Sequence, residues 1–239
     1  MEDAREFSIE ELIEAVGGRF SAALGIDLES KDTGEIFKWF LAAGLFGARI
    51  GEAIAIRTYR EFARRGVVTP QAVLNRGWDG LVEILDAGGY VRYDFKTATK
   101  LLEIADKLER EYHGDLNLLH ERAKDSQDLE RKLLEFKGIG PVTANIFLRE
   151  LRGVWERAEP LPSDLALLAA QNLGLIETGD PAQALEELQQ LFQRAAPRSS
   201  RFPDLESALV RLGKGWCRNG RHDPCPMRAH CLKIRQDME

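Results

Sequence analysis

Residues 134–144 read Leu-Glu-Phe-Lys-Gly-Ile-Gly-Pro-Val-Thr-Ala, and this stretch decides the fold. Apolar residues recur at helical spacing before it, so a helix leads into the turn and Gly138 can end that helix with a positive φ. Gly140 permits a second tight bend, and Pro141 suits the first position of a new helix. The stretch therefore predicts a helix, a Gly-Ile-Gly hairpin and a second helix, with Ile139 packed inward between them.

This hairpin predicts a phosphate-binding site. Backbone amides around Gly138 and Gly140, with the free amides at the start of the second helix, would converge on one point that no side chain blocks. One glycine is enough for an ordinary helical turn, so two glycines that flank an apolar residue and precede proline favour contact with phosphate. Lys137 lies just before the turn and would point toward the same phosphate.

The segment from Gly138 to Ala144 resembles the helix-hairpin-helix motif of the DNA glycosylase superfamily, which includes endonuclease III, the adenine glycosylases and the alkylpurine glycosylases. Other similar segments are Gly88-Gly89-Tyr90, Lys96-Thr97-Ala98 and His113-Gly114-Asp115 before the hairpin, and Leu161-Pro162-Ser163-Asp164-Leu165-Ala166-Leu167 and Arg211-Leu212-Gly213-Lys214-Gly215-Trp216-Cys217 after it. The segment with Asp164 resembles the alkylpurine branch, and the others resemble endonuclease III. Together they cover about residues 35–235, so the resemblance concerns a whole fold.

The resemblance implies an all-α, two-lobed helix-hairpin-helix glycosylase fold. One lobe would be a helical barrel of residues 35–152 that ends in the hairpin. The other lobe would combine residues 1–34 with residues 153–239 and carry a cysteine loop at about residues 216–232. The residue pattern agrees, because no segment shows sustained period-two alternation. Helices are expected from Asp32 through Leu45, over Gly51–Arg65 and Tyr93–Tyr112, and at Thr69-Pro70, Asp180-Pro181 and Pro203-Asp204.

Composition limits the class of protein. The chain has 239 residues, of which 44% are hydrophobic, and this suffices for one core or for two lobes. It has no run of 18 apolar residues, and its acidic N-terminus does not resemble a signal peptide. We therefore expect a cytoplasmic, nucleoid-associated monomer that makes no membrane contact. The net charge of −6 is unfavourable for binding DNA, so a locally basic face would be needed, and Arg and Lys concentrate after residue 210.

Asp164 is the candidate catalytic residue. Cleavage of an N-glycosidic bond builds positive charge on the deoxyribose, and a carboxylate beside C1′ stabilises that charge and can orient water. The sequence Leu161-Pro162-Ser163-Asp164 places Asp164 at the start of a helix, where the helix dipole favours the ionised carboxylate. The alternative is that Asp164 only caps the helix.

The resemblance also implies the type of activity. Bifunctional members of the family form a Schiff base between the sugar and a Lys in the helix after the hairpin. The matching position here is Val142, which has no amine. The resemblance therefore implies a monofunctional N-glycosylase that uses water and has no AP lyase activity. Leu41-Ala42-Ala43-Gly44 offers no carboxylate where adenine glycosylases have one. The implied partner is double-stranded DNA with a damaged or mismatched base, an alkylated purine among the candidates. Two alternatives stay open: a catalytically silent relative that binds DNA or lesions, and an endonuclease III-like enzyme with weak lyase activity.

Two further DNA-binding candidates come from the resemblance. The residue that fills the gap left by a flipped base falls at Arg49, and the apolar wedge falls at Gly89 beside Tyr90. Arg49 would fill the gap, or it would pair with Glu52 on a solvated helix. Four aromatic residues would line a base pocket or belong to the core: Trp39, Trp78, Tyr90 and Tyr93.

The last candidate site consists of three cysteines near the end of the chain, Cys217, Cys225 and Cys231, which are candidate metal ligands. Three thiols cannot all pair, and cysteines that gather in this way favour a metal. Family members show C-x6-C-x2-C-x5-C; here His222 takes the second position, and the gap from Cys217 to His222 is two residues shorter. The resemblance implies a [4Fe-4S] cluster held by Cys217, His222, Cys225 and Cys231. Zinc in the same ligands, or a metal-free loop packed by Trp216 and Leu232, are the alternatives, and His230 is a spare ligand.

Overall fold

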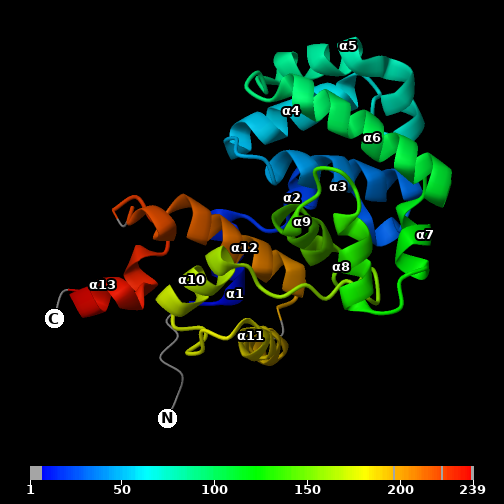
Figure 1. Cartoon of the computed structure of the whole chain (residues 1–239). Helices are drawn as coiled ribbons and strands as arrows, with labels where there is room; N and C mark the ends of the chain where they lie inside the picture. Colours follow the sequence, from blue (N-terminus) through cyan, green and yellow to red (C-terminus); the bar gives the residue numbers. More distant parts are fainter. Residues whose placement is uncertain (1–6, 196, 222, 238–239) are drawn as a thin grey trace. The chain divides into compact units, whose positions relative to one another are not determined.

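The computed structural model describes residues 7–195, 197–221 and 223–237, which form helices joined by loops (Figure 1). The α-helices are α1 (Ile9–Val16), α2 (Phe20–Ala23), α3 (Thr33–Phe46), α4 (Glu52–Arg64), α5 (Pro70–Gly88), α6 (Asp94–Tyr112), α7 (Leu116–Glu121), α8 (Ser126–Leu134), α9 (Pro141–Leu151), α10 (Asp164–Asn172), α11 (Pro181–Ala195), α12 (Phe202–Gly215) and α13 (Leu232–Asp237). Short 3₁₀ turns are η1 (Leu28–Ser30), η2 (Cys217–Asn219) and η3 (Arg228–His230).

The all-α expectation is confirmed for the described residues, where the only β-type pairing is one isolated bridge between Arg152 and Trp155. Among these helices, none is both long enough and apolar enough to cross a membrane. The acidic segment at residues 1–6, from which the sequence argued against a signal peptide, lies outside the described residues.

Two of the expected helices begin at side-chain caps. Asp32 Oδ1 accepts the amides of Gly34 and Glu35 at 2.8 and 3.1 Å and so begins α3. Thr69 Oγ1 accepts the amide of Ala72 at 3.1 Å at the start of α5, because the first amides of a helix need an acceptor outside it. The start of α12 differs slightly from expectation: the helix begins one residue before Pro203, which occupies its first turn.

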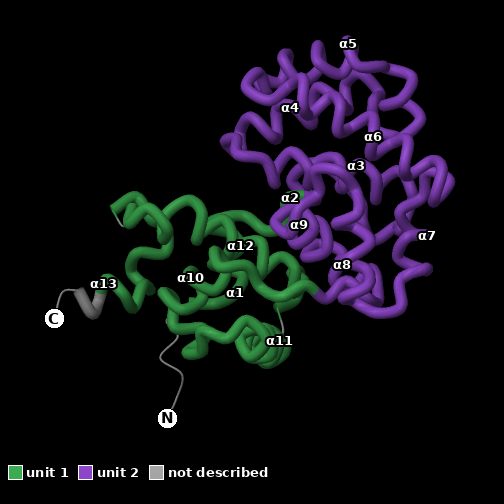
Figure 2. Tube along the Cα trace, viewed as in Figure 1, with its two compact units in different colours: residues 1–20, 160–239 green, residues 21–159 purple. Residues whose placement is uncertain are grey.

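The chain forms two compact units (Figure 2). Unit 1 combines Met1–Phe20 with Pro160–Glu239, and unit 2 is Ser21–Glu159. The expected boundaries were residues 34 and 152, so two flanking segments fall in unit 2 rather than in unit 1. The first segment contains η1, which packs against α3. The second contains Trp155, whose indole nitrogen donates to Asn117 Oδ1 at 2.9 Å.

Unit 2 is built around α3. Trp39 is fully buried, and its indole nitrogen donates to the Phe147 carbonyl oxygen of α9 at 3.0 Å. Phe40 meets Phe147 and Phe136 edge-on, with ring centroids 5.0 and 5.8 Å apart. Each such aromatic pair is worth about 0.5–1.5 kcal/mol beyond burial. These contacts fix the hairpin between α8 and α9 against the core of unit 2.

Unit 1 packs α1, α10 and α11 around α12, and its core includes Leu12, Leu188 and Leu209. The N-terminal segment is joined to α12 by polar contacts. Arg19 pairs with Asp204, with 3.1 Å between Nε and Oδ1, and the Arg211 guanidinium lies 3.6 Å from the centroid of the Phe20 ring. This unit positions α10, which carries Asp164, and the cysteine loop that follows α12.

Candidate functional site

The hairpin forms as the sequence predicts, with one change. Helix α8 ends at Leu134, four residues earlier than expected, and Gly138 lies in the turn with φ of 87°. Ile139 is buried at 7% exposure, and its amide donates to the Phe136 carbonyl oxygen at 3.0 Å. The prediction that Ile139 packs inward is therefore confirmed. Phe136, itself buried, completes the turn that was expected to be helical.

Gly140 differs from its expected role. We expected a second tight bend, but Gly140 is extended, with φ of −103° and ψ of 177°, and serves as the N-cap residue of α9. Any residue can adopt this conformation. A Cβ added at this position would have no atom within 4 Å, so the fold alone does not require glycine here. The space above Gly140 stays open to an approaching ligand.

Three backbone amides of the turn and of the start of α9 have no hydrogen-bond acceptor among the described residues and could donate to a ligand. Gly140 makes no side-chain cap, and Pro141 occupies the first turn of α9. Within the described part of the chain, the amides of Gly138, Gly140 and Val142 donate to no protein acceptor. Val142 is 66% exposed and aliphatic, so it brings no amine to this surface. Free amides at a helix N-terminus are the groups that bind phosphate oxygens in proteins.

Lysines surround this turn. Lys137, which the sequence assigned to phosphate, instead pairs with Glu103 of α6, with 2.7 Å between Nζ and Oε1. Sequence reasoning missed Lys100 of α6, whose side chain lies against Gly138. Lys100 is 38 positions away along the chain, and no local pattern connects it to the hairpin.

Asp164 is the first residue of α10, and Ser163 is the N-cap residue. Neither side chain caps the helix: Ser163 Oγ is buried without a partner, and the Asp164 carboxylate is exposed. In the residues that the structure describes, no hydrogen bond or ion pair involves this carboxylate. The capping alternative is therefore wrong in this structure, and the carboxylate is free for another role. Asp164 belongs to unit 1 and the hairpin to unit 2.

Arg49 is exposed in the loop between α3 and α4. The alternative that places it on a solvated helix is wrong, and no ion pair with Glu52 forms among the described residues. Within the described residues, its guanidinium has no hydrogen-bond or ion-pair partner.

Tyr90 is 4% exposed, and its hydroxyl accepts a hydrogen bond from Thr97 at 3.2 Å. Burial raises the pKa of the Tyr90 hydroxyl above its ordinary value. Tyr90 is thus a core residue rather than a surface that could meet DNA. Trp39 is also core, whereas Trp78 is 39% exposed and packs against Phe95.

The three thiols gather at one end of unit 1. Cys217 and Cys225 are partly buried against its core, and Cys231 is buried. Burial raises the pKa of the Cys217 thiol, and the nearby Cys225 and Cys231 add to the rise. No three His, Cys, Asp or Glu side chains in the described ranges are placed to share a metal ion. His222, the expected fourth ligand, lies outside those ranges.

The same loop is also held by packing. Trp216 Nε1 donates to the Pro224 carbonyl oxygen at 3.0 Å, and Met227 is 3% exposed. Leu232 lies against Gly174, as the packed alternative expects. One polar atom is left over: Nδ1 of His230 is buried without a partner.

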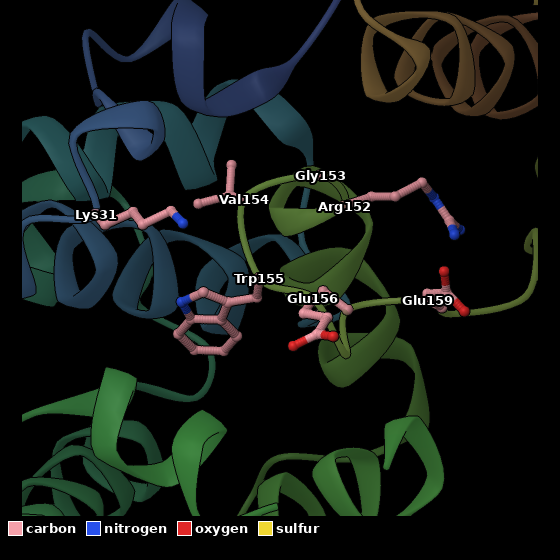
Figure 3. Close-up of a pocket in the computed structure, with 8 residues that line it drawn as sticks. Lys31, Arg152, Gly153, Val154, Trp155, Glu156 and Glu159 are labelled. Atoms are coloured by element: carbon pink, nitrogen blue, oxygen red, sulfur yellow. The ribbon is translucent and has the colours of Figure 1, made fainter.

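Unit 2 also contains a cavity of about 320 Å³, lined by Lys31 and by residues of the segment 152–159 (Figure 3). Its lining side chains spread along the segment and do not converge on one point. It includes neither Asp164 nor a hairpin residue, so it does not belong to the predicted site.

The fold of this chain resembles that of a solved DNA glycosylase structure. A crystal structure of the H. pylori 3-methyladenine DNA glycosylase MagIII, bound to 1,N6-ethenoadenine, superimposes with a TM-score of 0.52 at 14% identity. The match covers 87% of this chain and 98% of that one. The chain has the helix-hairpin-helix DNA glycosylase fold. No protein-family model and no curated protein sequence matches it.

Proposed function

We propose that this protein is a monofunctional DNA glycosylase that hydrolyses the N-glycosidic bond of a damaged base in double-stranded DNA. The observation that carries the proposal is the state of Asp164, which is exposed at the start of α10 and takes no part in capping. The glycosylase fold and the free amides of the hairpin support it. DNA repair by base excision is the process that this activity would serve.

Asp164 would act on the sugar. As the bond between C1′ and the base breaks, its electrons leave with the base and the deoxyribose becomes cationic. The carboxylate stabilises that cation, and water then adds to C1′ and loses a proton, which leaves an abasic site and a free base. The N-terminus of α10 favours the negative charge that this role needs.

Strand cleavage is not part of the proposal. A lyase step needs an amine that forms a Schiff base with C1′, and the position that would supply it here is Val142. We therefore expect an intact strand with an abasic site as the product.

An alkylated purine is the proposed substrate class. The only acidic residue of α3 is Glu35, which lies in its first turn and accepts the amide of Asp27 at 2.9 Å. This helix thus offers no free acid to protonate an ordinary adenine as it leaves. A purine alkylated on a ring nitrogen already carries positive charge in the nucleoside and leaves without that proton. The name of the fold neighbour, a 3-methyladenine DNA glycosylase, agrees with this class.

The test is Asp164→Asn in single-turnover base release. We expect the excision rate to fall by about 10²–10³-fold, with duplex binding kept or tightened and the melting temperature unchanged. The matched control is Asp180→Asn, because Asp180 caps α11 of the same unit through the amides of Ala182 and Gln183. This control should keep the excision rate. A wild-type rate in Asp164→Asn would remove Asp164 from catalysis, and tight duplex binding without release of any base would favour the silent relative.

We further propose that the cysteine loop binds a metal, with a [4Fe-4S] cluster as the first candidate and zinc as the second. The concentration of all three cysteines between residues 217 and 231 supports this, as does the unpartnered Nδ1 of His230 in the same loop. The ligands would be Cys217, Cys225 and Cys231, with His222 or His230 as the nitrogen donor. The metal would stabilise the loop and take no part in the chemistry at C1′.

Metal analysis of anaerobically purified protein tests this proposal. A cluster predicts about four irons per chain and broad absorption near 400 nm, and zinc predicts about one colourless ion. Cys225→Ser should release the metal, while Met227→Leu, a change in the packing of the same loop, should retain it. Iron and zinc both far below one per chain would contradict the proposal, and packing by Trp216 and Leu232 would then hold the loop.

A further inference from the structure

One face of α6 runs along the hairpin. Residues 100, 103 and 107 lie at i, i+3 and i+7, so their side chains share this face. The contacts pair Lys107 with Glu135, Glu103 with Lys137, and Lys100 with Gly138. The hairpin therefore has charged neighbours from an element that is distant in the sequence.

The Lys100 side chain lies against Gly138. A Cβ added to Gly138 would meet Cδ of Lys100 at 2.6 Å and Cε at 3.0 Å, so the lysine stem occupies the space that glycine leaves free. The ammonium is one bond beyond Cε, so it lies near Gly138. Lys100 is exposed, and within the described residues no carboxylate pairs with its ammonium.

Lys137 is in a different state. Its partner Glu103 has a second oxygen, Oε2, that is buried and has no partner. If Lys137 moved to a phosphate, the Glu103 carboxylate would lose its cation and face the phosphate charge. The Lys137 and Glu103 side chains are 67% and 40% exposed, so their ion pair stabilises the fold little. The two opposite charges nevertheless cancel, so the pair offers almost no net charge to a phosphate.

We propose that Lys100, and not Lys137, is the lysine that binds the DNA phosphate held by the hairpin amides. The proposal rests on the proposed function and adds a binding residue to it. The ligand is a phosphodiester of the duplex backbone, so the contact carries no sequence or lesion preference. A side chain at position 138 would displace the Lys100 stem, and the φ of 87° at Gly138 independently favours glycine there.

The salt dependence of duplex binding tests the proposal, with an undamaged duplex as the probe. Lys100→Met removes the charge and keeps an unbranched apolar stem over Gly138. Each phosphate contact contributes about 0.9 to the slope of log K against log [salt], so Lys100→Met should lower the slope by about that amount and the affinity by about tenfold at ~0.1 M salt. The matched controls are Lys137→Met beside the hairpin and Lys124→Met before α8, and each should lower the slope by less than half as much.

A slope equal to that of the wild type in Lys100→Met, or a larger loss in Lys137→Met, would overturn the proposal. Lys100→Gln repeats the test with a polar stem, and thermal melting verifies that each variant is folded. Failure of the proposed function gives a different result: the wild-type protein itself would then release no base from any damaged duplex, whatever the salt slopes of the variants are.

Discussion

Gly138 and Gly140 are glycines for different reasons. Gly138 is required by the fold, because its φ is 87° and the Lys100 stem fills the place of a side chain. Gly140 has an ordinary extended conformation and open space around it. A glycine that the fold does not need points to a ligand that approaches the backbone closely. The sequence pattern contained both residues, but only the backbone conformation separates their roles.

Gly140→Asn tests this distinction. Asn is a favoured N-cap, and its side-chain oxygen would accept an amide of α9 that otherwise faces the ligand. We expect an unchanged or higher melting temperature and affinity for damaged and undamaged duplexes about tenfold weaker, since one charge-assisted hydrogen bond is worth about 1.5–3 kcal/mol. The companion change Gly138→Ala should instead destabilise the fold by about 1–3 kcal/mol. Unchanged duplex affinity in Gly140→Asn would refute the phosphate role of the hairpin.

Local patterns predicted the positions of some candidate residues and missed others. The helix start at Asp164 and the turn at Gly138 were predicted because helix starts and turns depend on a few adjacent residues. Tyr90 was misassigned because its burial depends on packing within unit 2, which no local pattern reports. Lys100 was missed for the same reason: the contact with Gly138 exists only once α6 lies beside the hairpin.

At the scale of elements, the connection that follows α9 is held by stacked rings. The His120 imidazole of α7 lies parallel to the Trp155 indole, with ring centroids 4.9 Å apart, and its Nε2 accepts the amide of Arg157 at 3.4 Å. Burial lowers the pKa of His120, and the charge of Arg157 lowers it further. Folding therefore favours the neutral imidazole.

This packing predicts a pH dependence of stability. Because the folded pKa of His120 lies below its unfolded value of about 6.5, the unfolded chain binds more protons in mild acid. The contribution of His120 is complete above that value and is lost as the pH falls toward the folded pKa. His120→Gln should therefore reduce the drop in melting temperature between about pH 7.5 and pH 5.5. An identical drop in the variant and the wild type would show that His120 does not titrate between the two states.

Helix starts were easier to predict than helix ends. Asp32, Thr69 and the Asp180-Pro181 pair mark starts that the structure confirms. The end of α8 at Leu134 and the non-helical Gly77 inside α5 were not expected. An N-cap is visible as one residue type, whereas an end such as that of α8 depends on how Phe136 packs in the core.

At the scale of the whole molecule, the net charge of the protein opposes the proposed binding to DNA. The net charge of −6 repels DNA at long range, so binding has to come from local groups such as the hairpin amides and Lys100. Affinity should therefore fall with salt only in proportion to the few phosphates that these cationic groups contact. The two-lobed organisation was expected from the family resemblance and not from the residue pattern. The unit boundaries differ from it because packing of η1 and Trp155, which a motif does not record, assigns the flanking segments to unit 2.

A panel of labelled duplexes distinguishes a glycosylase that uses water from every alternative. The duplexes carry a purine methylated on a ring nitrogen, such as 3-methyladenine or 7-methylguanine, or they carry uracil, an oxidised pyrimidine or a mismatch. Each reaction is analysed for strand breaks with and without alkali. We predict base release from the alkylated purine, with strand breaks that appear only after alkali. Breaks without alkali would contradict the absence of an amine nucleophile at Val142, and no base release from any duplex would contradict the assignment of a glycosylase.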